Sequence, residues 1–198
     1  MMISTPDLTQ IVNSPGEISS AAVKLRKAVM DMELSPNQVM TVFDSWAKSL
    51  DARELNDIPG IVFLRMWLRR GTLEPIIARE LGGNGLHGGW NEYGRAECKA
   101  FPLGVVGHWP AGNVEIQPLL SMTCALLGGN AALVRVPRGL VDLTRRLMEK
   151  LVQSDPGEIL TRRIFMAAFE HSRQDLHEAM ARAVDGAMIW GGEEAVLQ

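Results

Sequence analysis

The sequence has 198 residues, of which 46% are hydrophobic and 22% are charged, and its formal net charge is −3. Such a chain is long enough for a domain with a sizeable core, and its charge balance gives no reason to expect nucleic acid as a partner. Its most apolar stretch, residues 118–134, is interrupted by Ser, Thr, Gly and Asn, so no membrane span is predicted. No N-terminal signal pattern is visible, and the chain is predicted to be cytoplasmic.

The first 94 residues are predicted to form a helical segment that ends in a Gly-rich loop. Apolar residues recur at helical spacing over residues 17–81, and Ser35-Pro36 marks a helix start, because Ser can cap the helix and Pro is tolerated in its first turn. Two short helices are predicted at 61–68 and 73–81, separated by Gly71-Thr72. Residues 82–94, rich in Gly and Asn, are predicted to be the loop.

From residue 95 onward the pattern changes to strands that alternate with helices. Such alternation predicts right-handed crossovers and a mainly parallel sheet, so the second half of the chain is predicted to be α/β. The candidate strands are 95–100, 104–108, 131–136, 164–169 and 187–190, and the candidate helices begin near 117, 140 and 172.

Two features that could indicate a ligand site, a glycine-rich motif and a pair of cysteines, are not supported by their sequence context. Residues 83–88, GNGLHG, match the G-x-G-x-x-G dinucleotide fingerprint, but the preceding segment is helical and no helix follows, so a loop is predicted instead. Cys98 and Cys124 have no metal-ligand spacing, and no metal site is predicted. The four histidines do not cluster with these cysteines; they are His87, His108, His171 and His177.

The turn around Asn113 is the strongest candidate site. Asn113 follows a predicted strand, at the edge where open α/β sheets bind ligands, and Pro118 places the start of the next helix near Gln117. Residues 111–116 are therefore predicted to form a turn whose amides and Asn113 side chain point outward. The spacing alone leaves two interpretations open: the turn faces a ligand, or Asn113 simply tolerates a left-handed conformation.

Two segments resemble a known family. Residues 102–139, PLGVVGHWPAGNVEIQPLLSMTCALLGGNAALVRVPRG, and residues 187–196, AMIWGGEEAV, are similar to the aldehyde dehydrogenase superfamily, and within it to LuxC-type acyl-CoA reductases. The resemblance is strong over 101–198 and weaker before. It implies an aldehyde-dehydrogenase-like, Rossmann-type parallel sheet, of which residues 95–198 form the first part, and NADPH-dependent reduction of an acyl thioester to an aldehyde.

The resemblance also implies roles for individual residues. Asn113 matches the asparagine that donates a hydrogen bond to the developing oxyanion. Arg135 and Arg138 stand where many members have a Lys and a ribose-binding Glu; because guanidinium groups pair with a 2′-phosphate, NADPH is predicted over NADH, the alternative being a solvated surface pair. Gly191 and Gly192 match the turn beside the nicotinamide, and Glu193 and Glu194 follow as first-turn acids.

The chain departs from the family in lacking the nucleophilic cysteine, which in this family lies downstream in a second domain. Cys98 and Cys124 cannot replace it by position, and Cys124 is predicted to be a small core residue. The 198 residues are therefore expected to be the N-terminal part of a reductase and inactive alone. Its expected substrate is acyl-CoA or an acyl carrier, and its expected partners are further copies of itself or acyl-transfer proteins.

Two alternatives remain open at this point. The short chain could be a nucleotide-binding or assembly module without catalysis, whose uncovered sheet edge needs a partner. It could also belong to another reductase of the same superfamily, such as a gamma-glutamyl phosphate reductase or an acylating aldehyde dehydrogenase.

Overall fold

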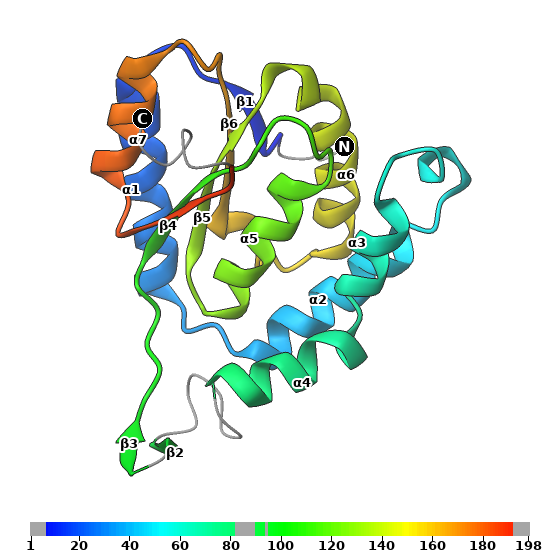
Figure 1. Cartoon of the computed structure of the whole chain (residues 1–198), viewed down its shortest axis with the longest axis vertical. Helices are drawn as coiled ribbons and strands as arrows, with labels where there is room; N and C mark the ends of the chain where they lie inside the picture. The colour runs from blue at the N-terminus through cyan, green and yellow to red at the C-terminus, as the bar shows by residue number, and fades with distance from the viewer. Residues whose placement is uncertain (1–6, 82–89, 94, 192–198) are drawn as a thin grey trace.

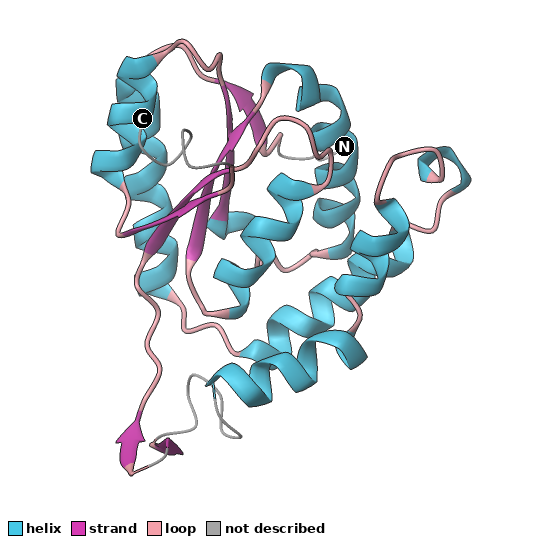
Figure 2. Cartoon of the chain, in the orientation of Figure 1, coloured by secondary structure: helices cyan, strands magenta, loops and turns pink. Residues whose placement is uncertain are grey.

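A five-stranded parallel sheet forms the centre of the structure (Figure 2). The computed structural model describes residues 7–81, 90–93 and 95–191. The strand order is β1-β6-β5-β4-β7, and every pairing in this sheet is parallel. In chain order the strands are β1 (Thr9–Ile11), β4 (Val105–Trp109), β5 (Ala131–Val136), β6 (Ile164–Ala168) and β7 (Gly186–Ile189).

Three helices connect the consecutive strands β4, β5, β6 and β7. They are α5 (Gln117–Leu127), α6 (Val141–Ser154) and α7 (Gln174–Ala183). The chain moves outward from β4 to β5 and β6 and then returns to place β7 on the other side of β4. The direction of winding therefore changes next to β4, and the carboxyl ends of the strands at such a switch point are where open α/β sheets bind ligands.

Helices cover both faces of the sheet (Figure 1). On one face, α1 (Pro15–Asp31) packs beside α7 and against β4, β5 and β6. On the other face, α5 and α6 lie between the sheet and α2 (Pro36–Ser49). Strand β5 illustrates the division, because Ala131 and Leu133 face the α1 side while Ala132, Val134 and Val136 face the α5 side. The sheet is therefore buried on both faces, as its nearly continuous apolar strands require.

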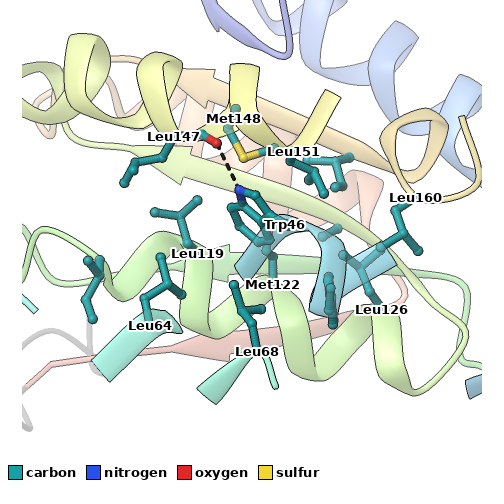
Figure 3. Packing of buried hydrophobic residues seen from close by; sticks show 14 of the residues in the cluster. Trp46, Leu64, Leu68, Leu119, Met122, Leu126, Leu147, Met148, Leu151 and Leu160 are labelled. Atoms are coloured by element: carbon teal, nitrogen blue, oxygen red, sulfur yellow. Dashed lines mark hydrogen bonds between the residues drawn. The ribbon is translucent and has the colours of Figure 1, made fainter. Parts of the chain in front are cut away.

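Trp46 anchors the outer helical layer to the α/β core (Figure 3). This residue of α2 is fully buried, and its indole Nε1 donates to the carbonyl oxygen of Leu147 in α6 at 3.1 Å. Around it lie side chains of α5 and α6, among them Leu119, Met122 and Leu151 (Figure 3). The remaining helices of this layer are α3 (Ile61–Trp67) and α4 (Arg70–Leu81).

The predicted helix start at Ser35-Pro36 is confirmed. Ser35 is the N-cap of α2, and its hydroxyl accepts from the amide of Gln38, while the Gln38 side chain accepts from the amide of Ser35. This reciprocal pair satisfies two amides that the helix itself leaves free. The strand predicted at 131–136 and the helix predicted to start near Gln117 are confirmed as well.

Other expectations for the first hundred residues were wrong in detail. The N-terminal segment is not purely helical, because β1 joins the main sheet beside β6. Gly71 and Thr72 do not separate two helices; both lie inside α4. Within the predicted loop 82–94, residues 91–93 form a strand, β2 (Asn91–Tyr93), which pairs antiparallel with β3 (Ala96–Cys98) in a separate ribbon. The GNGLHG motif lies outside the described residues.

Short 3₁₀ helices complete the described secondary structure: η1 (Arg53–Leu55), η2 (Arg138–Leu140) and η3 (Thr161–Arg163). Among residues 7–81, 90–93 and 95–191, no helix has both the length and the apolar composition needed to cross a membrane.

Candidate functional site

Four connections converge at the carboxyl edge of the sheet, where the structure places Asn113, Arg135, Arg138 and Gly191. Residues 110–116 follow β4 and are called the Asn113 turn below, while residues 137–140 follow β5. Residues 169–173 follow β6, and residues 190–191 follow β7. Because all four strands are parallel, their carboxyl ends lie at one edge of the sheet.

The Asn113 turn is held in place by the start of α5. The amide of Ala111 donates to the side-chain Oε1 of Gln117, the first residue of α5, at 2.6 Å, and the amide of Gln117 donates to the carbonyl of Val114 at 3.2 Å. Asn113 itself is exposed. Its side chain forms no hydrogen bond within the described part of the chain, and neither do the amides of Gly112 and Asn113. The turn therefore presents unused donors to solvent.

Trp190 joins the connection after β7 to the end of β4, where the Asn113 turn begins. Its backbone amide donates to the carbonyl oxygen of Trp109, the last residue of β4, at 2.9 Å. Gly191 follows Trp190, so this predicted cofactor-binding residue lies at the same edge as Asn113. Gly192, Glu193 and Glu194 lie outside the described residues.

A buried hydroxyl ties three elements together beneath this edge. The Oγ atom of Ser121 in α5 accepts from the indole Nε1 of Trp190 at 2.8 Å and lies 2.7 Å from Nδ1 of His108 in β4. It also lies 3.2 Å from the sulfur of Met188 in β7. Ser121 therefore links the strand before the Asn113 turn to the connection after β7.

His108 is fully buried, and its Nε2 has no partner among the described residues. Burial lowers the pKa of this imidazole from 6.5 to about 4, because the apolar surroundings disfavour the charged form. His108 is therefore neutral at neutral pH and acts as part of the scaffold under the site.

A second histidine lies on the opposite face of the sheet. His177 in α7 accepts from the indole Nε1 of Trp109 through its Nδ1 at 3.0 Å, and its ring packs edge-on against Phe169 at 5.0 Å. Its pKa is lowered by burial and by the positive charges of Arg135 and His171. The two tryptophans at the carboxyl ends of β4 and β7 thus each donate to a polar side chain that a neighbouring helix supplies.

Arg135 and Arg138 lie where β5 ends, next to the end of β6. Arg135 is half-buried, with its guanidinium carbon 5.9 Å from the centre of the Phe169 ring, and its Nε has no partner among the described residues. Burial lowers its pKa, and the negative charge of Glu170 opposes that change. Arg138 is exposed, and its Nε lies 3.4 Å from Oε1 of Glu170. This ion pair was not anticipated from the sequence.

Glu170, His108 and Ser121 are the site residues that sequence reasoning missed. Glu170 could have been found, because it follows a predicted strand directly and so falls at the ligand-binding edge. No local pattern identifies the link between His108, Ser121 and Trp190, since these residues are far apart in the chain.

The two cysteines lie away from this edge. Cys98 is exposed in the β2–β3 ribbon. Cys124 is exposed near the end of α5, so the prediction that it fills the core was wrong. The reason is that the buried positions of α5 surround but do not include Cys124; its neighbours Thr123 and Ala125 are buried instead.

Solved structures with the same arrangement define the fold class. The chain is similar to proline utilization A of Bradyrhizobium japonicum, with a TM-score of 0.62 and 15% identity over 92% of this chain and 20% of that chain. It is also similar to glyceraldehyde-3-phosphate dehydrogenase GapN from Methanocaldococcus jannaschii, which was crystallised with NADP, with a TM-score of 0.60 and 14% identity over 87% of this chain and 42% of that chain. The fold is that of the aldehyde dehydrogenase type.

Sequence comparison shows the family to which the chain belongs. The profile of the family described as acyl-CoA reductase (LuxC) matches residues 23–197, and the chain belongs to this family. Curated relatives include the long-chain acyl-protein thioester reductase of Vibrio harveyi, 28% identical over 64% of this chain, and long-chain acyl-protein thioester reductase 2 of Photobacterium leiognathi, 22% identical over 93% of this chain. The matched regions span 27% and 43% of these two relatives, less than half of either protein.

Proposed function

We propose that this chain forms the N-terminal part of an NADPH-dependent reductase that converts an acyl thioester to an aldehyde. The observation that carries the proposal is the contact between Trp190 and Trp109, which places the connection after β7 beside the Asn113 turn and its unused donors. Membership of the acyl-CoA reductase family and the names of the curated relatives support this reaction class.

Asn113 is the proposed oxyanion donor. Its side-chain amide is exposed and is unbonded within the described part of the chain, and the neighbouring backbone amides are equally available. Donors fixed before the reaction stabilise the negative charge that develops on the thioester oxygen without having to reorganise. Gln117 holds the turn in this position through its bond to the amide of Ala111.

The nucleophile is proposed to be a cysteine outside residues 1–198, which attacks the thioester to form an acyl-enzyme. Neither cysteine of this chain suits the role. Cys98 lies in the separate ribbon, and Cys124 lies near the end of α5, whereas the Asn113 turn precedes the start of that helix. We infer that residues 1–198 contain the oxyanion and cofactor sites but are inactive alone.

The residues at the ends of β5 and β7 fit a phosphorylated nicotinamide cofactor. Arg135 lies near the end of β5 and Arg138 two residues after it, and the Nε of Arg135 has no partner among the described residues. Guanidinium groups are suited to bidentate pairing with a phosphate, which favours NADPH over NADH. Gly191 would lie against the nicotinamide half. When bound, NADPH supplies the hydride that reduces the acyl group.

The acyl group is proposed to arrive on coenzyme A or on a carrier protein. The names of the curated relatives specify an acyl-protein thioester. We further propose a cytoplasmic protein that works as a homo-oligomer or together with acyl-transfer proteins.

The Asn113→Ala variant tests this function in the reductase as its host produces it. We expect kcat for reduction of a long-chain acyl-CoA by NADPH to fall by about 10²–10³, because one oxyanion donor is lost, while the Kd for NADPH stays unchanged. The Asn56→Ala variant serves as the control. Asn56 is exposed next to η1, so this variant removes the same side-chain amide away from the site. Full turnover in Asn113→Ala, or an equal loss in both variants, would contradict the proposal.

A further inference from the structure

The carboxylate of Glu170 lies beside Arg138 and close enough to Arg135 to affect its pKa. Both arginines are proposed to bind the cofactor phosphate. Strands β5 and β6 are paired up to their ends, with Val136 opposite Ala168, so the segments that follow them lie side by side. Glu170 comes two residues after β6, and its Oε1 lies 3.4 Å from Nε of Arg138. Glu170 and Arg138 therefore meet at the end of β5, and the negative charge of Glu170 also acts on Arg135.

The ion pair between Glu170 and Arg138 can be replaced by contacts of either side chain with a ligand. The two side chains are 62% and 41% exposed, and ion pairs between such exposed groups contribute little to stability. Either side chain can thus leave the other for a ligand at small cost. Arg135 differs, because its guanidinium is half-buried against the Phe169 ring and has no carboxylate partner among the described residues.

We propose that Glu170 sets the selectivity of this site between NADPH and NADH. Its carboxylate can accept a hydrogen bond from the 2′-hydroxyl of the NADH ribose, whereas it repels the 2′-phosphate of NADPH, which carries about −1.5 to −2 charges. Arg135 and Arg138 favour the phosphate, and Glu170 opposes them, so the wild-type preference for NADPH is limited. This inference rests on the proposed function.

The Glu170→Gln variant of the full chain tests the proposal through binding alone. The Kd values of NADPH and NADH are measured by quenching of tryptophan fluorescence. Removing one carboxylate charge near a doubly charged phosphate is expected to raise the preference for NADPH by about tenfold. Glu149→Gln is the matched control, because Glu149 is exposed in the second half of α6 and the same charge is removed there. Its preference should equal that of the wild type.

The outcomes separate the two proposals. If wild type binds both cofactors and Glu170→Gln leaves their ratio unchanged, or shifts it toward NADH, the role of Glu170 is overturned while the proposed function stands. If wild type binds neither cofactor, the proposed cofactor site itself is overturned. A melting temperature of Glu170→Gln equal to that of wild type shows that the variant is folded, and the exposure of the ion pair predicts this result.

Discussion

At the scale of single residues, His108 shows how burial fixes a protonation state. The side chain is fully buried between β4 and α5, one nitrogen lies 2.7 Å from Oγ of Ser121, and the other has no partner among the described residues. No acidic side chain in the described part of the chain pairs with it, and burial lowers its pKa from 6.5 to about 4. Above about pH 4 the fold therefore holds the ring in its neutral form.

This environment predicts a pH dependence of stability. The unfolded chain takes up a proton at His108 below pH 6.5, but the folded protein does so only below about pH 4. The part of the free energy of unfolding that is due to His108 should therefore rise by about 3 kcal/mol between pH 4 and pH 6.5. Above pH 6.5 this part should stay constant. Urea unfolding of wild type and of His108→Gln at several pH values measures this contribution as the difference between the two curves.

Acidic residues also titrate in this range, so only the comparison is informative. The glutamine side chain of the His108→Gln variant cannot take up a proton, and the variant should lose less stability than wild type on acidification. Parallel curves would show that His108 is not protonated on unfolding.

At the scale of elements, Ser121 connects β4, α5 and the connection after β7. A single hydroxyl contacts His108 and accepts the indole N–H of Trp190, while the backbone amide of Trp190 is bound to β4. Two of the segments proposed to line the site are thereby held at a fixed separation. The buried helix α5 acts as the common support.

Replacing Ser121 by Ala should loosen this support. The indole N–H of Trp190 loses its acceptor and His108 loses its only hydrogen-bonded side-chain neighbour among the described residues, so we expect the free energy of unfolding to fall by about 1–3 kcal/mol. Quenching of tryptophan fluorescence by acrylamide should increase as the connection after β7 becomes more mobile.

Ser19→Ala provides the matched control, because Ser19 is exposed on α1 and its hydroxyl bonds to the carbonyl of Pro15 within the same helix. If Ser121→Ala resembles this control in stability and quenching, the hydroxyl does not support the site.

Local chemistry explains which elements could be predicted. Pro118 restricts where α5 can begin, and the apolar run at 131–136 fits a strand buried on both faces. Strand β1 could not be predicted, because three residues carry no periodic signal and their pairing partner lies in β6. The positions of Asn113 and Glu170 at the site follow from the ends of strands. The role of Ser121 depends on contacts between distant segments.

At the scale of the whole molecule, residues 7–81 are part of the same core as the sheet. Helix α1 covers one face of the sheet beside α7, and α2 packs on α6 through Trp46. Strand β1 extends the sheet itself. The expected division near residue 94 therefore separates two patterns in the sequence, while packing crosses it in several places.

We expect residues 95–198 alone to fail to fold. Without α1, α2 and β1 this piece would expose Leu133, Phe169 and other side chains that are buried in the whole chain. Its far-UV circular dichroism should lack a cooperative thermal transition, while residues 7–198 should show one. A cooperative transition in the shorter piece would establish it as an independent domain.

The pairing of β1 with β6 also has a consequence for protein synthesis. Strand β1 leaves the ribosome well before its neighbour β6, which is completed only when residue 168 has been made. At typical rates of translation this interval is roughly 8–30 s. During that time α2, α3 and α4 can already form local contacts, whereas β1 stays unpaired. Strand β1 is therefore open to chaperones until β6 has been made.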